Sequence, residues 1–474
     1  MSAIIVIFSV AGLLWGTLLV ARGDAIGACL AYLLAACCFG HAFVNFDLGP
    51  VPLTIDRLVF VLLVAIFVVQ YRRSRADLKP LDSAEWLMVA LLSWFLVTMA
   101  VVDRAPDVEN RTLTMVRLVA GYLMPFGMYA IARHSLITAR KHALVLGSLA
   151  CFGVYLALTA ILEVACVWSL VFPRYIADPT VGLHFGRARG PMVQSVSLGL
   201  YLAVCLLALG LWRPRWGRVG ELARVAIVPL LIAGIVLTYT RSVWMGTGAA
   251  VVIVLALSLK TRPRAVLLGA VAVGALLAAT GLKDSLLGMY REGSATDARH
   301  SAELRGSLTY VSWLMFLDQP WMGVGFGEFP IAKLPYLSDR SSDLHLEAVR
   351  PYVHHNTFLS ILTETGAIGL GLFLTMLAIW ARRAWGLVRD PLAEPWARNQ
   401  GLLLMGTLAA YFCQLLFHEL SYTSIDHSLV FFIAGMTGGI RADWASSRVT
   451  EPTVSNSPSA CNWIRPRIRP SEHA

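Results

Sequence analysis

The stretch Val353-His354-His355-Asn356-Thr357-Phe358 marks the place where a long polar insert ends and an apolar helix begins. Before it, from about Gly281 to Tyr352, the membrane-spanning pattern of the rest of the chain stops. Apolar runs of ~20 residues lie on both sides, and each could cross ~30 Å of hydrocarbon as a helix. A hydrophilic insert that brings a histidine pair to the mouth of a helix predicts a membrane enzyme site at one water interface.

Composition excludes a soluble protein. The chain has 474 residues, 57% of them hydrophobic and 14% charged, whereas soluble domains carry ~25% charged residues. Alternating strands of a membrane barrel are absent, so the predicted fold class is all-α, a polytopic transmembrane helical bundle of about 12–14 spans with one large insert that contains amphipathic helices. The run Ala3–Ala21 lacks a basic start and a cleavage site, and we interpret it as a retained helix. We predict spans near 3–21, 25–43, 56–71, 85–102, 113–132, 143–165, 191–211, 222–239, 242–259, 265–281, 357–380, 400–418 and 427–440.

The cationic residues and cysteines also restrict the function classes. The net charge of +10 comes from arginines in short loops, where they set membrane topology, so nucleic-acid binding is not indicated. The cysteines lie mostly in or beside apolar runs and have no metal-ligand spacing with histidine, which predicts small buried side chains without a metal or a disulfide framework.

Basic loops predict the orientation. They follow the third span, precede the sixth, separate the seventh from the eighth and the ninth from the tenth, and follow the eleventh. Because such loops stay in the cytoplasm, the insert would face the periplasm of a bacterial inner membrane. The predicted organisation is a set of N-terminal spans, a core that includes a periplasmic loop, a set of C-terminal spans and a disordered cytoplasmic tail, over residues 1–224, 225–380 with the loop at 282–356, 381–440 and 441–474.

Two local patterns locate turns and helices near the predicted site. Leu222–Leu259 is too long for one span, so the polar cluster Thr238–Ser242 predicts a turn at the outer surface. Inside the insert, Glu303–Phe316 has apolar residues at helical spacing, and Asp318-Gln319-Pro320 would end that helix. We expect it to rest with its apolar face on the membrane interface.

Arginines on the outer side suggest an anion site. They are Arg187, Arg189, Arg241, Arg305 and Arg350. The positive-inside bias disfavours cations there, and converging guanidinium groups repel one another unless they share an anion. Guanidinium binds phosphate oxygens bidentately, which lysine cannot do. The alternative is that these side chains extend into lipid headgroups or pair with glutamates of the insert.

The histidine pair supplies a candidate base. A neutral imidazole can take a proton from an attacking hydroxyl, and nearby arginines would lower its pKa and keep it neutral. The alternative for His354 and His355 is interfacial capping of the next helix, for which Asn356 is itself a good N-cap. Adjacent histidines suit one metal ion poorly, so no metal is predicted. Glu364 follows about two turns into the helix, before Gly366 and Gly369, which would allow close helix packing.

These residues, in this order, resemble the bacterial O-antigen ligase and O-antigen polymerase superfamily. The match comprises Tyr239-Thr240-Arg241-Ser242, then Arg305, Trp313 and Gln319–Gly327, then His355-Asn356-Thr357-Phe358-Leu359 with Glu364–Leu370. Arg189-Gly190-Pro191 resembles an upstream element more weakly, and Gln194 or Ser195 stands where the family usually has asparagine.

The resemblance implies a GT-C-type glycosyltransferase that needs no metal or other cofactor. Its partners would be a glycan linked to undecaprenyl diphosphate, an acceptor glycan or lipid A core, the bilayer and polysaccharide-assembly proteins. It places Arg241, Arg305 and His355 at catalytic positions. Diphosphate or glycan contacts are predicted for Arg187, Arg189, Arg350, His354, Asn356 and Glu364.

Several functions stay open at this stage. A polymerase and a ligase differ in acceptor, and nothing in the sequence separates them. A lipid-linked oligosaccharide flippase or polysaccharide transporter would place ionisable residues within the spans, where Glu163 is the main candidate. A structural scaffold would leave the outer arginines unexplained.

Overall fold

The computed structural model describes residues 23–450 except 41, 44, 47–51, 74–75, 77, 102–107, 214–216, 260–262, 264–293 and 340. The predicted spans 3–21 and 265–281, and the tail beyond residue 450, lie outside the described residues.

The described chain is helical apart from one antiparallel pair of two-residue strands, β1 (Asn45–Phe46) and β2 (Leu53–Thr54). This confirms the predicted all-α bundle. The α-helices are α2 (Ala25–Cys38), α3 (Ile55–Arg72), α4 (Ser83–Val101), α5 (Val108–Leu118), α6 (Met124–His134), α7 (Ala139–Val164), α8 (Ser195–Leu211), α9 (Gly217–Leu237), α10 (Arg241–Ser258), α13 (Ser294–Asp318), α14 (Phe329–Ala332), α15 (Thr357–Arg389), α16 (Pro395–Phe417) and α17 (Ser424–Thr450). A π-helical turn, Val119–Leu123, joins α5 to α6.

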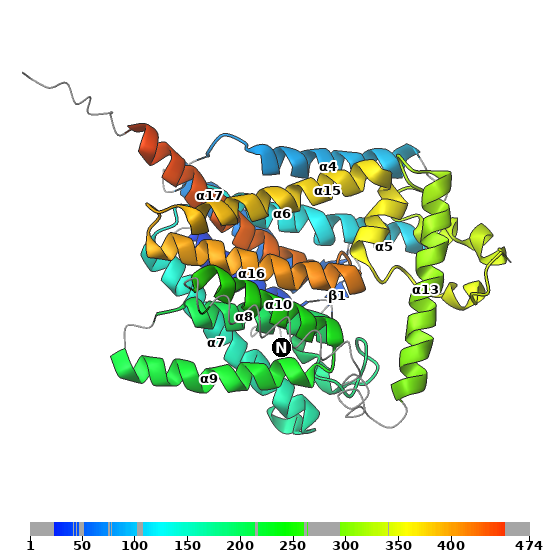
Figure 1. Ribbon diagram of the computed structural model, residues 1–474, viewed down its shortest axis with the longest axis horizontal. Coiled ribbons are helices and arrows are strands. Elements are labelled where there is room, and N and C mark those ends of the chain that lie inside the picture. Colours follow the sequence, from blue (N-terminus) through cyan, green and yellow to red (C-terminus); the bar gives the residue numbers. More distant parts are fainter. Residues whose placement is uncertain are drawn as a thin grey trace, which may run out of the picture.

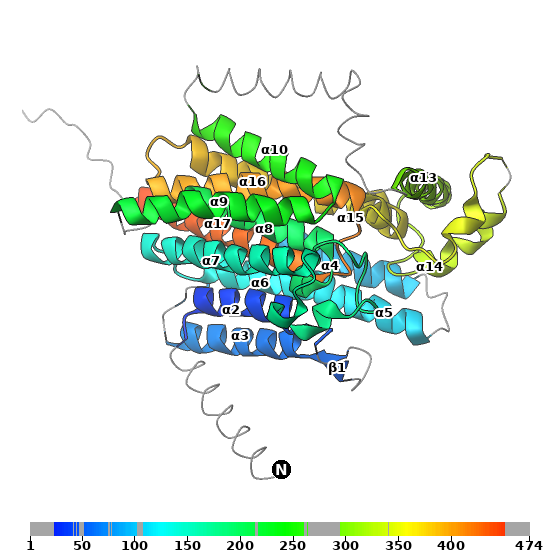
Figure 2. The same cartoon turned by 90° about the horizontal axis from the view of Figure 1, so that it is seen from below.

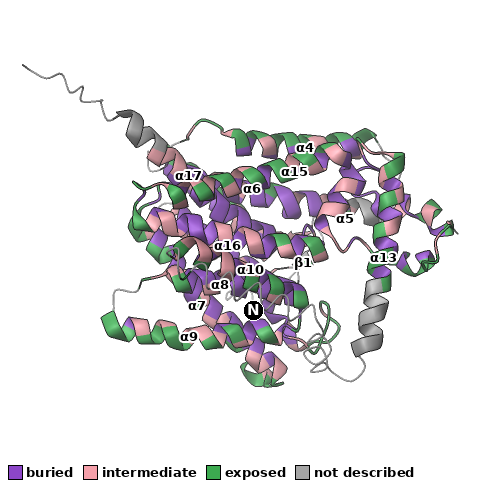
Figure 3. Cartoon of the chain, viewed as in Figure 1, coloured by how far each residue is buried: buried purple, intermediate pink, exposed green. Residues whose placement is uncertain are grey.

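Seven described helices are both long and apolar enough to cross a membrane. The prediction of about 12–14 spans counted further runs that form shorter or more polar helices. Among these, α2 has 14 residues and α8 has 17, while α3 carries Asp56, Arg57 and Arg72 within its length. The short α8 is buried on almost all sides, and exposed side chains gather on outer helices such as α4 and α9 (Figure 3). A helix enclosed by others needs less length than one that faces lipid.

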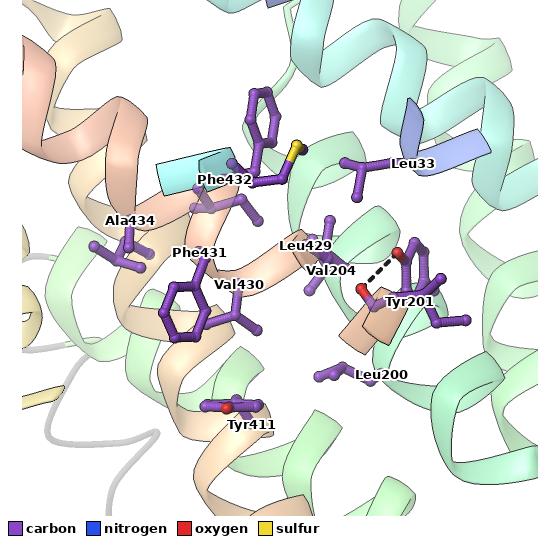
Figure 4. Close-up of a cluster of buried hydrophobic side chains, with 14 of the residues drawn as sticks. Leu33, Leu200, Tyr201, Val204, Tyr411, Leu429, Val430, Phe431, Phe432 and Ala434 are labelled. Carbon is purple, nitrogen blue, oxygen red and sulfur yellow. Dashed lines mark hydrogen bonds between the residues drawn. The ribbon is translucent and has the colours of Figure 1, made fainter. Parts of the chain in front are cut away.

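The bundle core forms where α17 passes between its neighbours. Leu429, Val430, Phe431 and Phe432 of α17 are fully buried and lie near side chains of α8 and α16 (Figure 4). The Tyr201 hydroxyl donates to the carbonyl of Ile425 at 2.9 Å. This bond satisfies a polar atom that would otherwise be costly in an apolar core.

The two ends of the bundle differ in character. The long helices run roughly side by side, and α13 crosses one of their ends at a steep angle (Figure 1). The C-terminal ends of α6, α8 and α15, at or beside the basic residues Arg133, Arg213 and Arg389, lie at the opposite end (Figure 2). The insert and the basic loops are therefore separated by the length of the bundle, as the orientation argument requires. Which end faces the periplasm remains a prediction.

The apolar face of α13 is covered by protein, and our expectation that it rests on the membrane was wrong. Leu304, Leu308, Val311 and Met315 are buried in a small second core with residues of the remaining insert. The predicted end of this helix is right, because α13 stops at Asp318. Helical spacing identifies an apolar face but not its partner, and here the insert folds onto the helix.

Candidate functional site

The turn between α9 and α10 delivers Arg241 to the end of the bundle that carries the insert. As predicted, α9 ends at Leu237 and α10 begins at Arg241. Thr240 is the N-cap residue of α10, and Tyr239 before it has a positive φ of 46°. The turn reverses the chain within a few residues, so Arg241 occupies the first turn of its helix with an exposed side chain.

Asn356 holds the segment that carries His355 at the N-terminal end of α15. Its side-chain oxygen accepts from the backbone N–H of Leu359 at 2.9 Å, which makes it the N-cap of the helix. Its amide nitrogen donates to the carbonyl of Leu416 at 2.9 Å. These bonds tie the residue after His355 to the end of α16 and give Asn356 a structural role; its contact with substrate stays a prediction.

The helix that follows is broken at Gly366, with φ 68° and ψ −172°. The glycine-rich turn after α13 docks on this break. Its backbone N–H groups at Val324 and Gly325 donate to the carbonyls of Thr363 at 2.9 Å and Glu364 at 3.0 Å. Gly366 thus allows a close approach, as its glycine suggested, but to the backbone of this turn: a Cβ atom there would lie 2.1 Å from the carbonyl oxygen of Trp321.

Two predicted arginines and the predicted base lie in one electrostatic cluster. The pKa of Arg305 is lowered by partial removal from water and by the positive charge of Arg241. The pKa of His355 is lowered by burial first, then by Arg305 and by His184. Arg305 therefore interacts electrostatically with both Arg241 and His355, although the three residues come from α10, α13 and the segment just before α15.

Two further histidines, His184 and His418, belong to this cluster and were missed. Burial, Arg187 and Arg305 lower the pKa of His184. Burial, Arg305, His355 and His184 lower the pKa of His418 to about 3. Both histidines flank span ends on the side of the insert, and that position was the signal available in the sequence.

His418 also joins two parts of the site through hydrogen bonds. Its Nε2 lies 2.8 Å from the hydroxyl of Ser242, the residue after Arg241. Its carbonyl accepts from the hydroxyl of Thr357 at 2.8 Å. The end of α16 is thereby tied to the starts of both α10 and α15.

Two of the arginines predicted to contact the substrate, Arg189 and Arg350, lie outside this cluster. The guanidinium of Arg189 is fully buried, ion-paired with Glu163 at 3.2 Å and bonded to the carbonyls of Val181 and Ile176. This pairing also accounts for Glu163, the span carboxylate on which a transporter could have relied. Arg350 pairs with Glu347 at 2.9 Å on the exposed rim of the insert. Arg187 remains beside His184 in the cluster.

His354 and Glu364 point into protein. His354 is 3% exposed, so only His355 of the pair is accessible. The ring centroid of His354 lies 3.6 Å from that of Phe329. Glu364 is 1% exposed and pairs with Arg117 at 2.5 Å. The spans thus hold more buried ionisable groups than the sequence suggested. The Arg117–Glu364 pair lies inside the protein behind the cluster.

The resulting arrangement could bind an anion and activate a hydroxyl group. Arg305 adds positive charge next to His355 and interacts with Arg241, and the lowered pKa of His355 keeps its imidazole neutral near pH 7 and able to accept a proton. Arginine pairs of this kind bind phosphate oxygens. Among the described residues, no cluster of histidine, cysteine or carboxylate side chains could hold a metal ion.

Part of this chain is similar to known proteins. Residues 225–374 match the O-antigen ligase family. The chain is also 25% identical over 298 residues to the exopolysaccharide production protein ExoQ of Rhizobium meliloti (strain 1021). That match covers 57% of this chain and 63% of the relative, so the chain spans less than two thirds of the relative's length. This protein is therefore a multi-pass membrane protein in which residues 225–374 match the O-antigen ligase family, and it is a distant homologue of a polysaccharide production protein.

Proposed function

We propose that this protein transfers a glycan from a polyprenyl diphosphate, as found on undecaprenyl carriers, to an acceptor hydroxyl at the membrane end that carries the insert. The observation that carries the proposal is that His418 ties the start of α10, where Arg241 lies, to the start of α15 beside His355, while Arg305 interacts electrostatically with both Arg241 and His355. The family match over residues 225–374 supports a glycan-transferring enzyme but does not specify the donor.

In the proposed reaction, the acceptor hydroxyl oxygen attacks the anomeric carbon of the donor sugar. The bond from that carbon to the diphosphate oxygen breaks, and the diphosphate leaves with the electron pair. His355 takes the hydroxyl proton, for which a general base contributes ~10²–10⁴-fold. Arg241 and Arg305 stabilise the charge that develops on the leaving diphosphate.

We favour a lipid-linked glycan as acceptor, which makes the protein a polysaccharide polymerase. The support is the similarity to a protein named for exopolysaccharide production. A ligase would instead use a lipid A core. The flippase alternative loses support from Glu163 and Glu364, because both carboxylates are paired with buried arginines instead of lining a path through the bundle.

Purified protein in proteoliposomes tests the activity directly. We expect it to lengthen undecaprenyl-diphosphate-linked oligosaccharides and to release undecaprenyl diphosphate, without added metal. Arg241→Ala should lose transfer, whereas Arg398→Gln at the opposite end should retain it, since Arg398 bonds only locally to the carbonyl of Pro391. Movement of intact donor across the bilayer without new glycosidic bonds would refute the proposal.

A deletion strain separates the acceptors. Single repeats on the carrier lipid should accumulate if a polymerase is lost, and long chains on the carrier if a ligase is lost. Accumulation on the cytoplasmic side would favour the flippase.

A further inference from the structure

The buried guanidinium of Arg117 joins three segments that also carry or adjoin residues of the Arg305–His355 cluster. Arg117 of α5 donates from Nη1 to the Glu364 carboxylate at 2.5 Å and from Nη2 to the Ser360 hydroxyl at 2.8 Å. Its Nε donates to the Ser421 hydroxyl at 2.6 Å. Arg117 and Glu364 are each 1% exposed, so neither can reach a substrate in the cluster.

Each segment held by Arg117 carries a residue of the site. Ser360 and Glu364 lie in the first turns of α15, a helix that begins two residues after His355. Ser421 lies in the α16–α17 loop, three residues after His418.

A third contact reaches the segment after α13. The Arg117 guanidinium carbon lies 4.8 Å from the ring centroid of Phe326, and Phe326 stacks on Phe95 of α4 with ring centroids 4.6 Å apart. Phe326 belongs to the glycine-rich turn that follows α13, the helix of Arg305. Arg117 therefore contacts all three segments on which Arg305, His355 and His418 depend.

We propose that Arg117 and Glu364 are a positioning ion pair that sets the spacing of His355, His418 and Arg305. The inference rests on the transfer reaction proposed above. A guanidinium with three directed donors fixes the orientation of its partners as well as their distance. Since a misplacement of ~1 Å can cost ~10²-fold in rate, loss of this orientation should act on turnover.

Energetics provide a way to separate positioning from mere packing. Removing one partner leaves an unpaired buried charge and is strongly destabilising, whereas replacing both by apolar side chains of similar size is often neutral or stabilising. The double variant Arg117→Met/Glu364→Met should therefore fold. It leaves the nearby Glu419 carboxylate, 3.9 Å from Arg117, with its bonds from the backbone N–H and hydroxyl of Ser421. The matched control is Arg133→Met/Glu85→Met, which removes another buried pair, 2.6 Å apart, at the opposite end of the bundle and likewise leaves neighbouring groups, Asp82 and His134.

We expect the double variant to lower kcat by ~10²-fold with KM for the lipid donor changed less than about threefold. The control double should keep kcat. A second readout is the rate at which diethyl pyrocarbonate modifies the neutral imidazole of His355, measured by mass spectrometry, which should change in the double variant only. This readout needs no turnover, so it decides the inference even if the wild-type protein proves to have a different activity.

Wild-type kcat and wild-type His355 reactivity in the folded double variant would overturn the proposal and leave a packing role. If that variant does not fold, Arg117→Lys and Glu364→Gln take its place. A lysine cannot reach three acceptors at once, so kcat should fall at least ~10-fold and His355 reactivity should change. Wild-type values for both substitutions would equally overturn the proposal.

Discussion

Replacing Gly366 with alanine tests whether the break in α15 is needed for the glycine-rich turn after α13 to dock on this helix. Gly366 has φ 68° and ψ −172° inside a helix that continues on both sides. A Cβ atom there would lie 2.1 Å from the carbonyl oxygen of Trp321 and 2.7 Å from the backbone nitrogen of Met322. Both obstacles are backbone atoms of the docked turn, so no side-chain rotation can relieve the overlap.

The expected cost follows from the local geometry. Forcing a residue other than glycine into this backbone region costs ~1–3 kcal/mol. Displacing the turn also strains three backbone hydrogen bonds, of which the one from Ala367 to the carbonyl of Pro320 is 2.8 Å long, and each contributes ~0.5–1.5 kcal/mol. We therefore expect a loss of about 3–5 kcal/mol in the free energy of unfolding.

Gly371→Ala is the matched control. It lies in the same helix, and a Cβ atom there meets nothing within 4 Å, so alanine should stabilise the helix by ~1 kcal/mol. Thermal unfolding of both variants in one detergent measures the contrast, and Gly366→Ala should melt well below wild type. If it melts at or above the temperature of Gly371→Ala, the docked turn does not depend on the break in the helix.

Four further outcomes address the chemistry. Arg241→Lys should abolish most transfer without loss of expression, because a point charge cannot replace the planar fork; full activity would contradict bidentate phosphate binding. His355→Ala should slow transfer by ~10²–10⁴-fold while donor binding persists, and normal turnover would exclude it as the base. Arg305→Gln should move the acidic limb of the pH–rate profile to higher pH, because removing this cation raises the pKa of His355. An unmoved limb would show that Arg305 does not affect the protonation of His355. For the wild-type enzyme, the acidic limb of kcat should lie at higher pH than that of kcat/KM, and coincident limbs would argue against a donor anion beside His355.

The sequence predicted helix positions well because apolar run length is a local property. The runs near 56–71, 85–102 and 400–418 became α3, α4 and α16 with similar bounds. It predicted the surroundings of α13 badly, because its apolar face could have met lipid or protein. Only the fold of the insert, which places Phe329 and Leu346 against that face, decides the matter.

For the site, the sequence identified residue types but not their partners. Arg187, Arg189 and Arg241 stand near span ends and Arg305 in the insert, yet only tertiary structure shows that Glu163 takes Arg189 out of the group. The pairing of Arg117 with Glu364 joins helices far apart in the chain, and a single sequence carries no signal for it.

The charge pattern of the cluster explains why the two acidic limbs should differ. In the free protein, burial and Arg305 lower the pKa of His355, which keeps it unprotonated near pH 7 but makes it a weak base. A bound diphosphate brings negative charge next to the same arginines and opposes their effect, so the pKa of His355 rises when the donor binds. Since kcat/KM reports the pKa in the free enzyme and kcat that in the complex, the base would gain strength only when the leaving group is present. In the proposed mechanism Arg305 thus has two effects: it binds the diphosphate together with Arg241, and it weakens His355 as a base until the diphosphate arrives.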